Sequence, residues 1–180
     1  MKPIDLLAVP AGALFALLST SIPAQGPAPA TPDPYQPLAF LIGHCWMGAF
    51  PGGRQTDEHC FSWMYGRKFV RDQHVVRGPD GGTLQSGESI YVWDAAARQL
   101  QYLYIESSGG FSRGAVTAAG DALVFPAASY VDGSGKAQAV RSRWTRSGDE
   151  AYEVLTEFEG KDGWLRGFSL RMQRVRDAPP

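Results

Sequence analysis

The chain has 180 residues, and its 17 Lys and Arg nearly balance its 18 Asp and Glu. This balance speaks against a nucleic-acid partner or an anionic membrane surface, which would favour a clearly basic chain. About 140 residues remain after the two N-terminal segments described next, which is the size of one domain.

The first segment has the pattern of a secretory leader. A short start with one Lys precedes the apolar stretch 6–18, and the small residue Ala24 offers a cleavage site, so we predict removal of residues 1–24. A retained anchor is the alternative, although the apolar stretch is shorter than the roughly 20 residues of a membrane-spanning helix. We expect a periplasmic or secreted protein with no stable membrane insertion after the leader is removed.

Residues 25–37 are rich in Pro and Ala and predict an extended linker. Residues 38–176 form the predicted folded domain, and residues 177–180 form a short tail. The stretch 36–42 is the only helix-like piece before the first strand. A short helix or 3₁₀ turn there would cover one end of the domain.

The rest of the chain predicts β-strands. Runs rich in aromatic and β-branched residues alternate with turn signals about every ten to fifteen residues. Short connections favour up-and-down antiparallel pairing, and closure would remove the edge strands. We therefore predict an all-β, antiparallel up-and-down barrel of about ten strands. The turn signals are 51–53, 66–67, 79–82, 94–98, 108–110, 120–121, 132–135, 147–149 and 160–163.

The first hairpin predicts a disulfide. If Gly52 and Gly53 form a two-residue turn, Cys45 falls directly opposite Cys60 on the neighbouring strand. Antiparallel neighbours lie close enough for a disulfide, and an exported chain with two cysteines is a setting in which one forms. The alternative is a pair of free buried thiols.

The second hairpin predicts a cluster of polar side chains. A two-residue turn between the second and third strands places His59 opposite His74 and Phe61 opposite Asp72. With His44, all histidines of the chain could then share one face of three adjacent strands. Such a cluster could bind a divalent metal or transfer protons, but no spacing motif supports a metal site and none is predicted. A three-residue turn would break this alignment, and histidines hydrogen-bonded near a barrel end or exposed at its rim are the alternative.

From Phe40 to Arg176 the chain resembles the bacterial lipocalin-like domains of the calycin group. The resemblance implies a closed barrel with a central cavity, and the family carries no agreed activity. Haem-binding relatives use a histidine late in the chain, but none follows His74 here, so we expect neither haem nor another cofactor. The matching segments are Leu41-Ile42-Gly43-His44-Cys45-Trp46-Met47-Gly48, Tyr91-Val92-Trp93-Asp94, Gly109-Gly110-Phe111-Ser112-Arg113-Gly114 and Trp164-Leu165-Arg166-Gly167-Phe168-Ser169-Leu170-Arg171-Met172-Gln173-Arg174.

The resemblance also implies which side chains point inward. In lipocalin-like barrels the tryptophan after the opening glycine plugs the closed end, so Trp46 is expected to point inward. Alternation along the paired strands then places His59, Phe61 and Trp63 inside and the two cysteines outside.

The closing strand is expected to support this plug. Related barrels set a basic residue of the strand against the plug tryptophan, where a cation can stack on the indole. Trp164 and Met172 share one predicted face, which Arg174 continues, so we expect Arg174 to stack on Trp46. Arg171, on the other face, is the alternative.

The sequence indicates the function of the protein only as a broad class. We expect the barrel to bind a small apolar molecule, lipid-like or aromatic. The alternatives are a cavity enzyme, an isomerase or lyase that uses the His/Asp cluster, and a non-catalytic envelope interaction or stress protein. Neither a phosphate-binding glycine loop nor a G-x-S-x-G elbow occurs, so no catalytic residue is assigned. The expected ligand contacts are His59, Phe61, Trp63, Asp72, His74, Tyr102, Tyr104 and Trp144.

Overall fold

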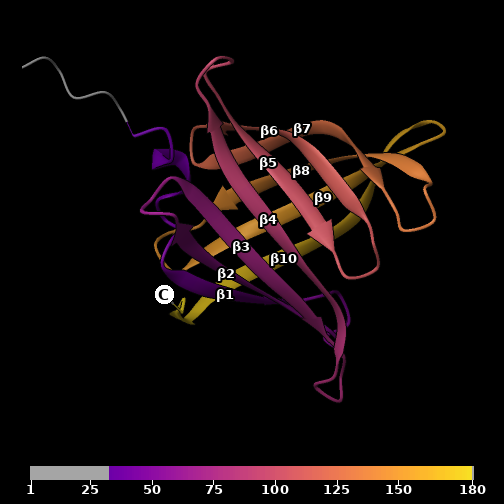
Figure 1. Ribbon diagram of the computed structural model, residues 1–180. Coiled ribbons are helices and arrows are strands. Elements are labelled where there is room, and N and C mark those ends of the chain that lie inside the picture. Colours follow the sequence, from indigo (N-terminus) through magenta and orange to yellow (C-terminus); the bar gives the residue numbers. More distant parts are fainter. Residues whose placement is uncertain (1–32, 180) are drawn as a thin grey trace, which may run out of the picture. The chain divides into compact units, whose positions relative to one another are not determined.

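The structure, a computed structural model, describes residues 33–179, so the predicted leader and most of the predicted linker lie outside the described residues. Ten antiparallel strands form one closed barrel, in which each strand pairs with the next and β10 closes against β1 (Figure 1). The predicted all-β up-and-down barrel is confirmed. The strands are β1 (His44–Ala49), β2 (Thr56–Met64), β3 (Phe69–Arg77), β4 (Thr83–Asp94), β5 (Gln99–Glu106), β6 (Phe111–Ala119), β7 (Ala122–Val131), β8 (Ala137–Arg146), β9 (Ala151–Gly160) and β10 (Gly163–Asp177).

The hairpin of β1 and β2 has the predicted register. Cys45 lies directly opposite Cys60, and their sulfur atoms form a disulfide bond, as predicted. Gly52 and Gly53 at the hairpin tip both have a positive φ, which glycine adopts without steric conflict from a Cβ atom. The connection is longer than the predicted two-residue turn, since the N–H of Phe50 bonds to the carbonyl of Gln55, but it leaves the strands in the predicted register.

One end of the barrel is covered by the chain before β1. The only helix of residues 33–179 is the 3₁₀ helix η1 (Gln36–Leu38), so the predicted short helix is a single turn. It cannot extend far, because the N–H of Gly43 already bonds to the carbonyl of Phe61 in β2. Leu38, the last residue of this turn, and Leu41, which follows it, are fully buried. No helix in the described range is long and apolar enough to cross a membrane.

The packed part of the chain is longer at both ends than the predicted domain. Tyr35 is buried, and its hydroxyl donates to the carbonyl of Lys68 and accepts from the N–H of Trp93. Residues 35–37, assigned to the linker, therefore belong to the covered end. At the other terminus β10 extends to Asp177, and Ala178 donates its N–H to the backbone just before β1.

Trp46 plugs the barrel from inside at this end. Its side chain is fully buried, and its ring meets those of Phe40 and Tyr152 edge to face at centroid distances of 6.2 and 5.2 Å. The indole N–H donates to the carbonyl of Leu41 at 3.4 Å. The tryptophan thus points inward, as the resemblance implied.

A bulge interrupts the alternation of β10 between Arg166 and Phe168. Phe168 lines the barrel interior, whereas Trp164 lies on the outer face, where the guanidinium of Arg141 stacks 4.4 Å from its ring centroid. The prediction that Trp164 shares a face with the later apolar residues of this strand is wrong. One extra residue, Gly167, changes which side chains face inward.

Arg174 does not stack on Trp46, although the two residues are paired in the β1–β10 ladder. Its Nε forms an ion pair with Glu150 at 3.3 Å, and its Nη1 lies 3.4 Å from Nε2 of His44. The alternative, Arg171, pairs with an acid of β9. The stacking prediction is wrong because both arginines find opposite charges at the surface, and aromatic rings already enclose the indole.

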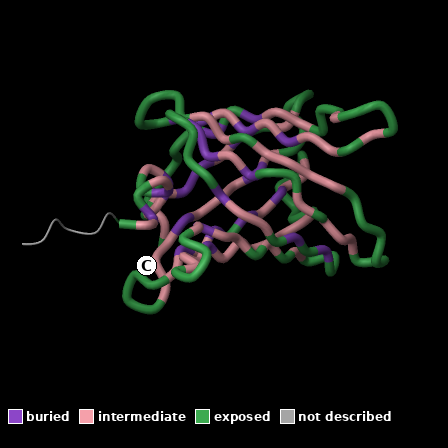
Figure 2. The backbone as a smooth tube through the Cα atoms, turned by 90° about the horizontal axis from the view of Figure 1, so that it is seen from above, coloured by how far each residue is buried: buried purple, intermediate pink, exposed green. Residues whose placement is uncertain are grey.

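The exposed and buried residues are distributed as expected for a barrel whose inward-facing side chains fill or line its interior. Figure 2 shows the exposed stretches mainly in the loops and the buried residues along the strands. In β3 every second residue is buried, namely Val70, Asp72, His74 and Val76. Two of these four, Asp72 and His74, are ionisable, and both belong to the interior site described next.

Candidate ligand-binding cavity

The barrel encloses a cavity of about 370 Å³ with two unlike walls. Phe50 and Tyr130, beside hairpin loops at the end that η1 does not cover, are among its lining residues, so the cavity extends toward that end. The aromatic wall, formed by β7 to β10, includes the rings of Phe125, Trp144, Phe158 and Phe168 together with the aliphatic Leu170. The opposite side, formed by β2 to β5, is more polar, and six of its residues form a hydrogen-bonded chain, here called the polar chain: Asp57, His59, Asp72, His74, Tyr104 and Glu106.

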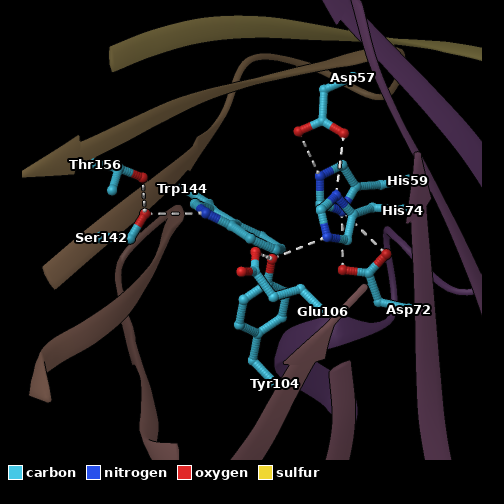
Figure 3. A network of polar contacts seen from close by, with 9 residues as sticks. All are labelled: Asp57, His59, Asp72, His74, Tyr104, Glu106, Ser142, Trp144 and Thr156. Atoms are coloured by element: carbon cyan, nitrogen blue, oxygen red, sulfur yellow. Dashed lines mark hydrogen bonds and ion pairs between the residues drawn. The ribbon is translucent and has the colours of Figure 1, made fainter. Parts of the chain in front are cut away.

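Asp57 links the two histidines of the polar chain (Figure 3). Its Oδ2 lies 3.1 Å from Nε2 of His59, and its Oδ1 lies 3.3 Å from Nδ1 of His74. On its other side, Nδ1 of His59 lies 3.0 and 2.9 Å from the two carboxylate oxygens of Asp72. Each ring nitrogen of His59 thus faces a carboxylate, and both can be donors only in the imidazolium form.

The polar chain continues from His74 toward the uncovered end of the barrel. Nε2 of His74 lies 3.1 Å from the hydroxyl of Tyr104, which donates to Oε2 of Glu106 at 3.1 Å. The two oxygens of Glu106 accept from four donors, which uses the roughly four acceptor positions of a carboxylate. These donors are Gln85, Tyr104, Ser108 and Tyr130.

Strand alternation places these side chains on one face. They come in pairs two positions apart, and such pairs point to the same side of a strand. His59 lies opposite His74 in the β2–β3 register, and their rings stack 5.0 Å apart at 18°. The pairs are Asp57 and His59 in β2, Asp72 and His74 in β3, and Tyr104 and Glu106 in β5.

Gly87 of β4 leaves room for the link between β3 and β5. It pairs with His74 on one side and with Glu106 on the other. A Cβ atom here would collide with the His74 ring and approach the carbonyl of Ile105. Because Gly87 has no side chain, His74 reaches across β4 to Tyr104.

The flanking carboxylates favour a charged His59. Burial would lower the pKa of His59, but the charges of Asp72 and Asp57 and their hydrogen bonds raise it well above its usual value. Burial would likewise raise the pKa of Asp57, but the charge of His59 and hydrogen bonds from both histidines hold it well below the ordinary range. Asp57 and His59 therefore form an ion pair at neutral pH.

Glu106 is also ionised at neutral pH. Burial would raise the pKa of Glu106, but hydrogen bonds from Ser108, Tyr130 and Tyr104 lower it. Burial, followed by the hydrogen bond and charge of Glu106, raises the pKa of Tyr130 to about 12. Burial and Glu106 also raise the pKa of Tyr104. Both tyrosines therefore remain protonated donors.

The charges on the wall do not balance. The polar chain has three carboxylates and two histidines, so it stays negative even when both rings are protonated. Arg141 also borders the cavity, but its neighbours Val140 and Ser142 are inward residues of β8. Its guanidinium pairs with Glu157 at 2.7 Å on the outer face, so it does not neutralise the interior.

The same cluster could offer ligand atoms to a divalent cation, since atoms of Asp57, His59 and His74 lie within 4.8 Å of one another. The two rings are nearly parallel, however, so their nitrogen lone pairs do not converge on one point. A metal would have to turn the rings and displace the protons between them and Asp57. The arrangement in the structure favours a hydrogen-bonded cluster over a metal centre.

Trp144 is held in place on the aromatic wall by its polar edge (Figure 3). Its indole N–H donates to Oγ of Ser142 at 3.2 Å, and this hydroxyl lies 3.0 Å from that of Thr156. The indole also packs against Phe125, at a centroid distance of 4.7 Å. The ring is therefore a fixed surface of the cavity.

The structure brings most of the predicted contact residues together. Phe61 does not line the cavity: it is fully buried and packs between Tyr91 and Trp144. Trp63 packs against Tyr35 at the covered end. The residues that do line the cavity are His59, Asp72, His74, Tyr102, Tyr104 and Trp144.

His44 does not join the other two histidines. It is the first residue of β1, and its Nδ1 lies 3.2 Å from Asp177 at the end of the barrel. The expectation of three clustered histidines is wrong because His44 lies beside the plug Trp46, beyond the cavity. Histidines near a barrel end were the alternative, and this holds for His44 alone.

Sequence reasoning missed several cavity residues. Asp57 lies two positions before His59 and Glu106 two positions after Tyr104, so alternation alone carried the signal for both. Phe125 and Ser142 lie in β7 and β8, whose registers no sequence feature had anchored.

Comparison with known proteins shows the fold alone. No known family model matches the chain, and no curated protein matches it. Among solved structures, the crystal structure of Rv2717c from M. tuberculosis is similar, with a TM-score of 0.55 and 16% sequence identity. The match covers 79% of this chain and 98% of that chain. The protein thus shares with that structure the fold of a closed antiparallel barrel, here of ten strands.

Proposed function

We propose that the protein is an exported binding protein that holds a small, largely apolar molecule, aromatic or lipid-like, inside its barrel. The cavity is the observation that carries this proposal. Its volume of about 370 Å³ falls within the roughly 300–1,000 Å³ of small-molecule sites. Apolar burial against the aromatic wall contributes roughly 25 cal/mol per Å² before the entropic costs of binding.

The division of the cavity into two walls suits a ligand with one polar group. Small-molecule sites are mostly apolar and use a few placed polar groups to orient the ligand. Here Trp144 and Phe125 offer the apolar surface, and Asp57, His74 and Tyr104 offer the polar contacts. The ligand would lie with its apolar body against the first group and its polar end toward the second.

Two features support export. The predicted leader would direct the chain out of the cytoplasm, and the Cys45–Cys60 disulfide suits an oxidising compartment.

A fluorescence titration with the neutral probe N-phenyl-1-naphthylamine tests cavity binding. Val140 lines the cavity and is the cross-strand neighbour of Phe158. Val140→Phe therefore fills part of the cavity and is expected to weaken probe binding by about tenfold. Val175→Phe, at an exposed position of β10, is the matched control and keeps wild-type affinity. Circular dichroism checks that both variants fold. Probe binding that is absent in the wild type, or equal in all three proteins, contradicts the proposal.

A second candidate function, proton-transfer catalysis by an isomerase or lyase, is favoured by the unbroken hydrogen-bond chain from Asp72 to Glu106. Tyr104, whose hydroxyl is a donor in this hydrogen-bond chain, lines the cavity. A molecule recovered from protein incubated in D₂O would then carry deuterium at carbon, and Tyr104→Phe would lose this exchange. A bound molecule recovered without deuterium contradicts catalysis and leaves the binding role intact.

A further inference from the structure

We propose that the ligand of the cavity is an organic cation, an aromatic or apolar body that carries an ammonium group, with the ammonium at Asp57. This inference rests on the proposed binding function and names the chemical class of the ligand. It comes from the charge of the polar chain, the free acceptor positions of Asp57 and the aromatic surfaces opposite.

The interior needs a positive charge that the described protein does not supply. With its carboxylates ionised, the polar chain is negative in every protonation state of its two histidines. The arginine that borders the cavity, Arg141, has its guanidinium on the outer face with Glu157 and Trp164. Uncompensated charge in a barrel interior is costly, and a cationic ligand would offset it.

Asp57 is the carboxylate that can receive the cation. Each of its oxygens has one contact, to His59 or to His74, so about two of its four acceptor positions stay free. Glu106 has no free position, because four donors already occupy its oxygens. Asp57 is also the first inward acid of β2, next to the hairpin loop at the uncovered end of the barrel.

The opposite wall suits the rest of such a ligand. Faces of Trp and Tyr attract cations, and a cation between an aromatic surface and a carboxylate gains from both. Trp144 presents a fixed ring, and Phe125 extends the surface. A carboxylate ligand would meet net negative charge at the same place, and a neutral ligand would leave that charge uncompensated.

Isothermal titration calorimetry at pH 7.5 with three ligands of matched shape tests the inference. The ligands are 2-(1-naphthyl)ethylamine, which is cationic, 2-(1-naphthyl)ethanol, which is neutral, and 1-naphthylacetate, which is anionic. We expect the amine to bind at least about tenfold more tightly than the alcohol, and the acid to bind most weakly. Equal or tighter binding of the alcohol or the acid overturns the cation inference but leaves the proposed function standing. Failure of all three to bind, together with failure of the neutral fluorescent probe, overturns both.

Variants locate the ammonium. Asp57→Asn is expected to remove the advantage of the amine, because it weakens binding of the amine far more than binding of the alcohol. Asp162→Asn, in the exposed loop between β9 and β10, makes the same charge change and is expected to keep wild-type selectivity. If Asp57→Asn retains the full preference for the amine, the assignment to Asp57 is wrong. The three-ligand comparison on the wild type decides the cation inference even if this variant does not fold.

Discussion

The rings of His59 and His74 lie face to face, 5.0 Å apart, and both bond to the same carboxylate. Two imidazoles at this distance repel each other when both are charged, and the carboxylate of Asp57 between their nitrogens offsets that repulsion. The arrangement of the polar chain therefore depends on one buried acid.

Replacing this acid should destabilise the barrel. Asp57→Asn removes the charge that both histidines contact, and hydrogen bonds to charged groups contribute about 1.5–3 kcal/mol. We expect the free energy of unfolding to fall by about 2 kcal/mol in urea titrations at pH 7. The exposed control Asp162→Asn should change it by less than about 0.5 kcal/mol. Equal stabilities of the two variants would show that the Asp57 contacts do not stabilise the fold.

The pH dependence of stability should show two limbs with opposite signs. The pKa of Asp57 is lowered in the folded protein, so its contribution is present above the unfolded value of about 3.9 and is lost as the pH falls through the folded value. The pKa of His59 is raised, so its contribution is present below about 6.5 and is lost as the pH rises through the folded value. The pair therefore stabilises most between about pH 4 and 6.5.

Urea unfolding of the wild type and of Asp57→Asn across this range checks the assignment. The variant should lose the acid limb attributable to Asp57, and its alkaline limb should be smaller and end at lower pH, because only Asp72 then raises the pKa of His59. Curves that run parallel at every pH would contradict this role of the pair.

Gly87 should tolerate no side chain while His74 is present. Gly87→Ala places a Cβ against the His74 ring, and such overpacking costs about 1–3 kcal/mol. In a His74→Ala background the loss should shrink, although the nearby carbonyl of Ile105 keeps part of it. Chemical unfolding of the single and double variants measures the coupling. If the losses in unfolding free energy of the two single variants simply add in the double variant, the cost of a side chain at Gly87 does not depend on His74.

The disulfide should stabilise the first hairpin and the barrel that closes on it. Cys45 and Cys60 are 15 residues apart, and closing a loop of this size contributes about 3 kcal/mol in the chain-entropy model. The Cys45→Ala, Cys60→Ala double variant should lose about this much in urea titrations. A reducing agent should destabilise the wild type and leave the double variant unchanged. Free thiols detected in the unreduced, denatured wild type would contradict the bond.

The sequence predicts the part of the site that lies on strands joined by short hairpin connections, because such a connection fixes which residues face each other. Two short hairpins set the registers of Cys45 with Cys60 and of His59 with His74, and both registers are confirmed. The predicted face of Trp164 failed because the bulge at Gly167 leaves no clear trace in the residue pattern.

The link from His74 to Tyr104 could not be predicted for a different reason. It crosses β4 and depends on the missing side chain of Gly87, so no two-strand register contains it. The charge imbalance of the interior likewise emerges only when Asp57, Asp72 and Glu106 from three strands are seen on one wall.

The central claim is that the barrel interior binds a small molecule, and the indole N–H signals of two tryptophans test it most directly. Trp144 lines the cavity, whereas Trp164 lies on the outer face beneath Arg141. Nuclear magnetic resonance spectra of ¹⁵N-labelled protein, assigned with Trp144→Phe and Trp164→Phe, would be recorded during titration with N-phenyl-1-naphthylamine. We expect the Trp144 signal to shift in a saturable manner while the Trp164 signal stays in place. A titration that moves Trp164 and leaves Trp144 unchanged would place the probe on the outer surface and contradict the account.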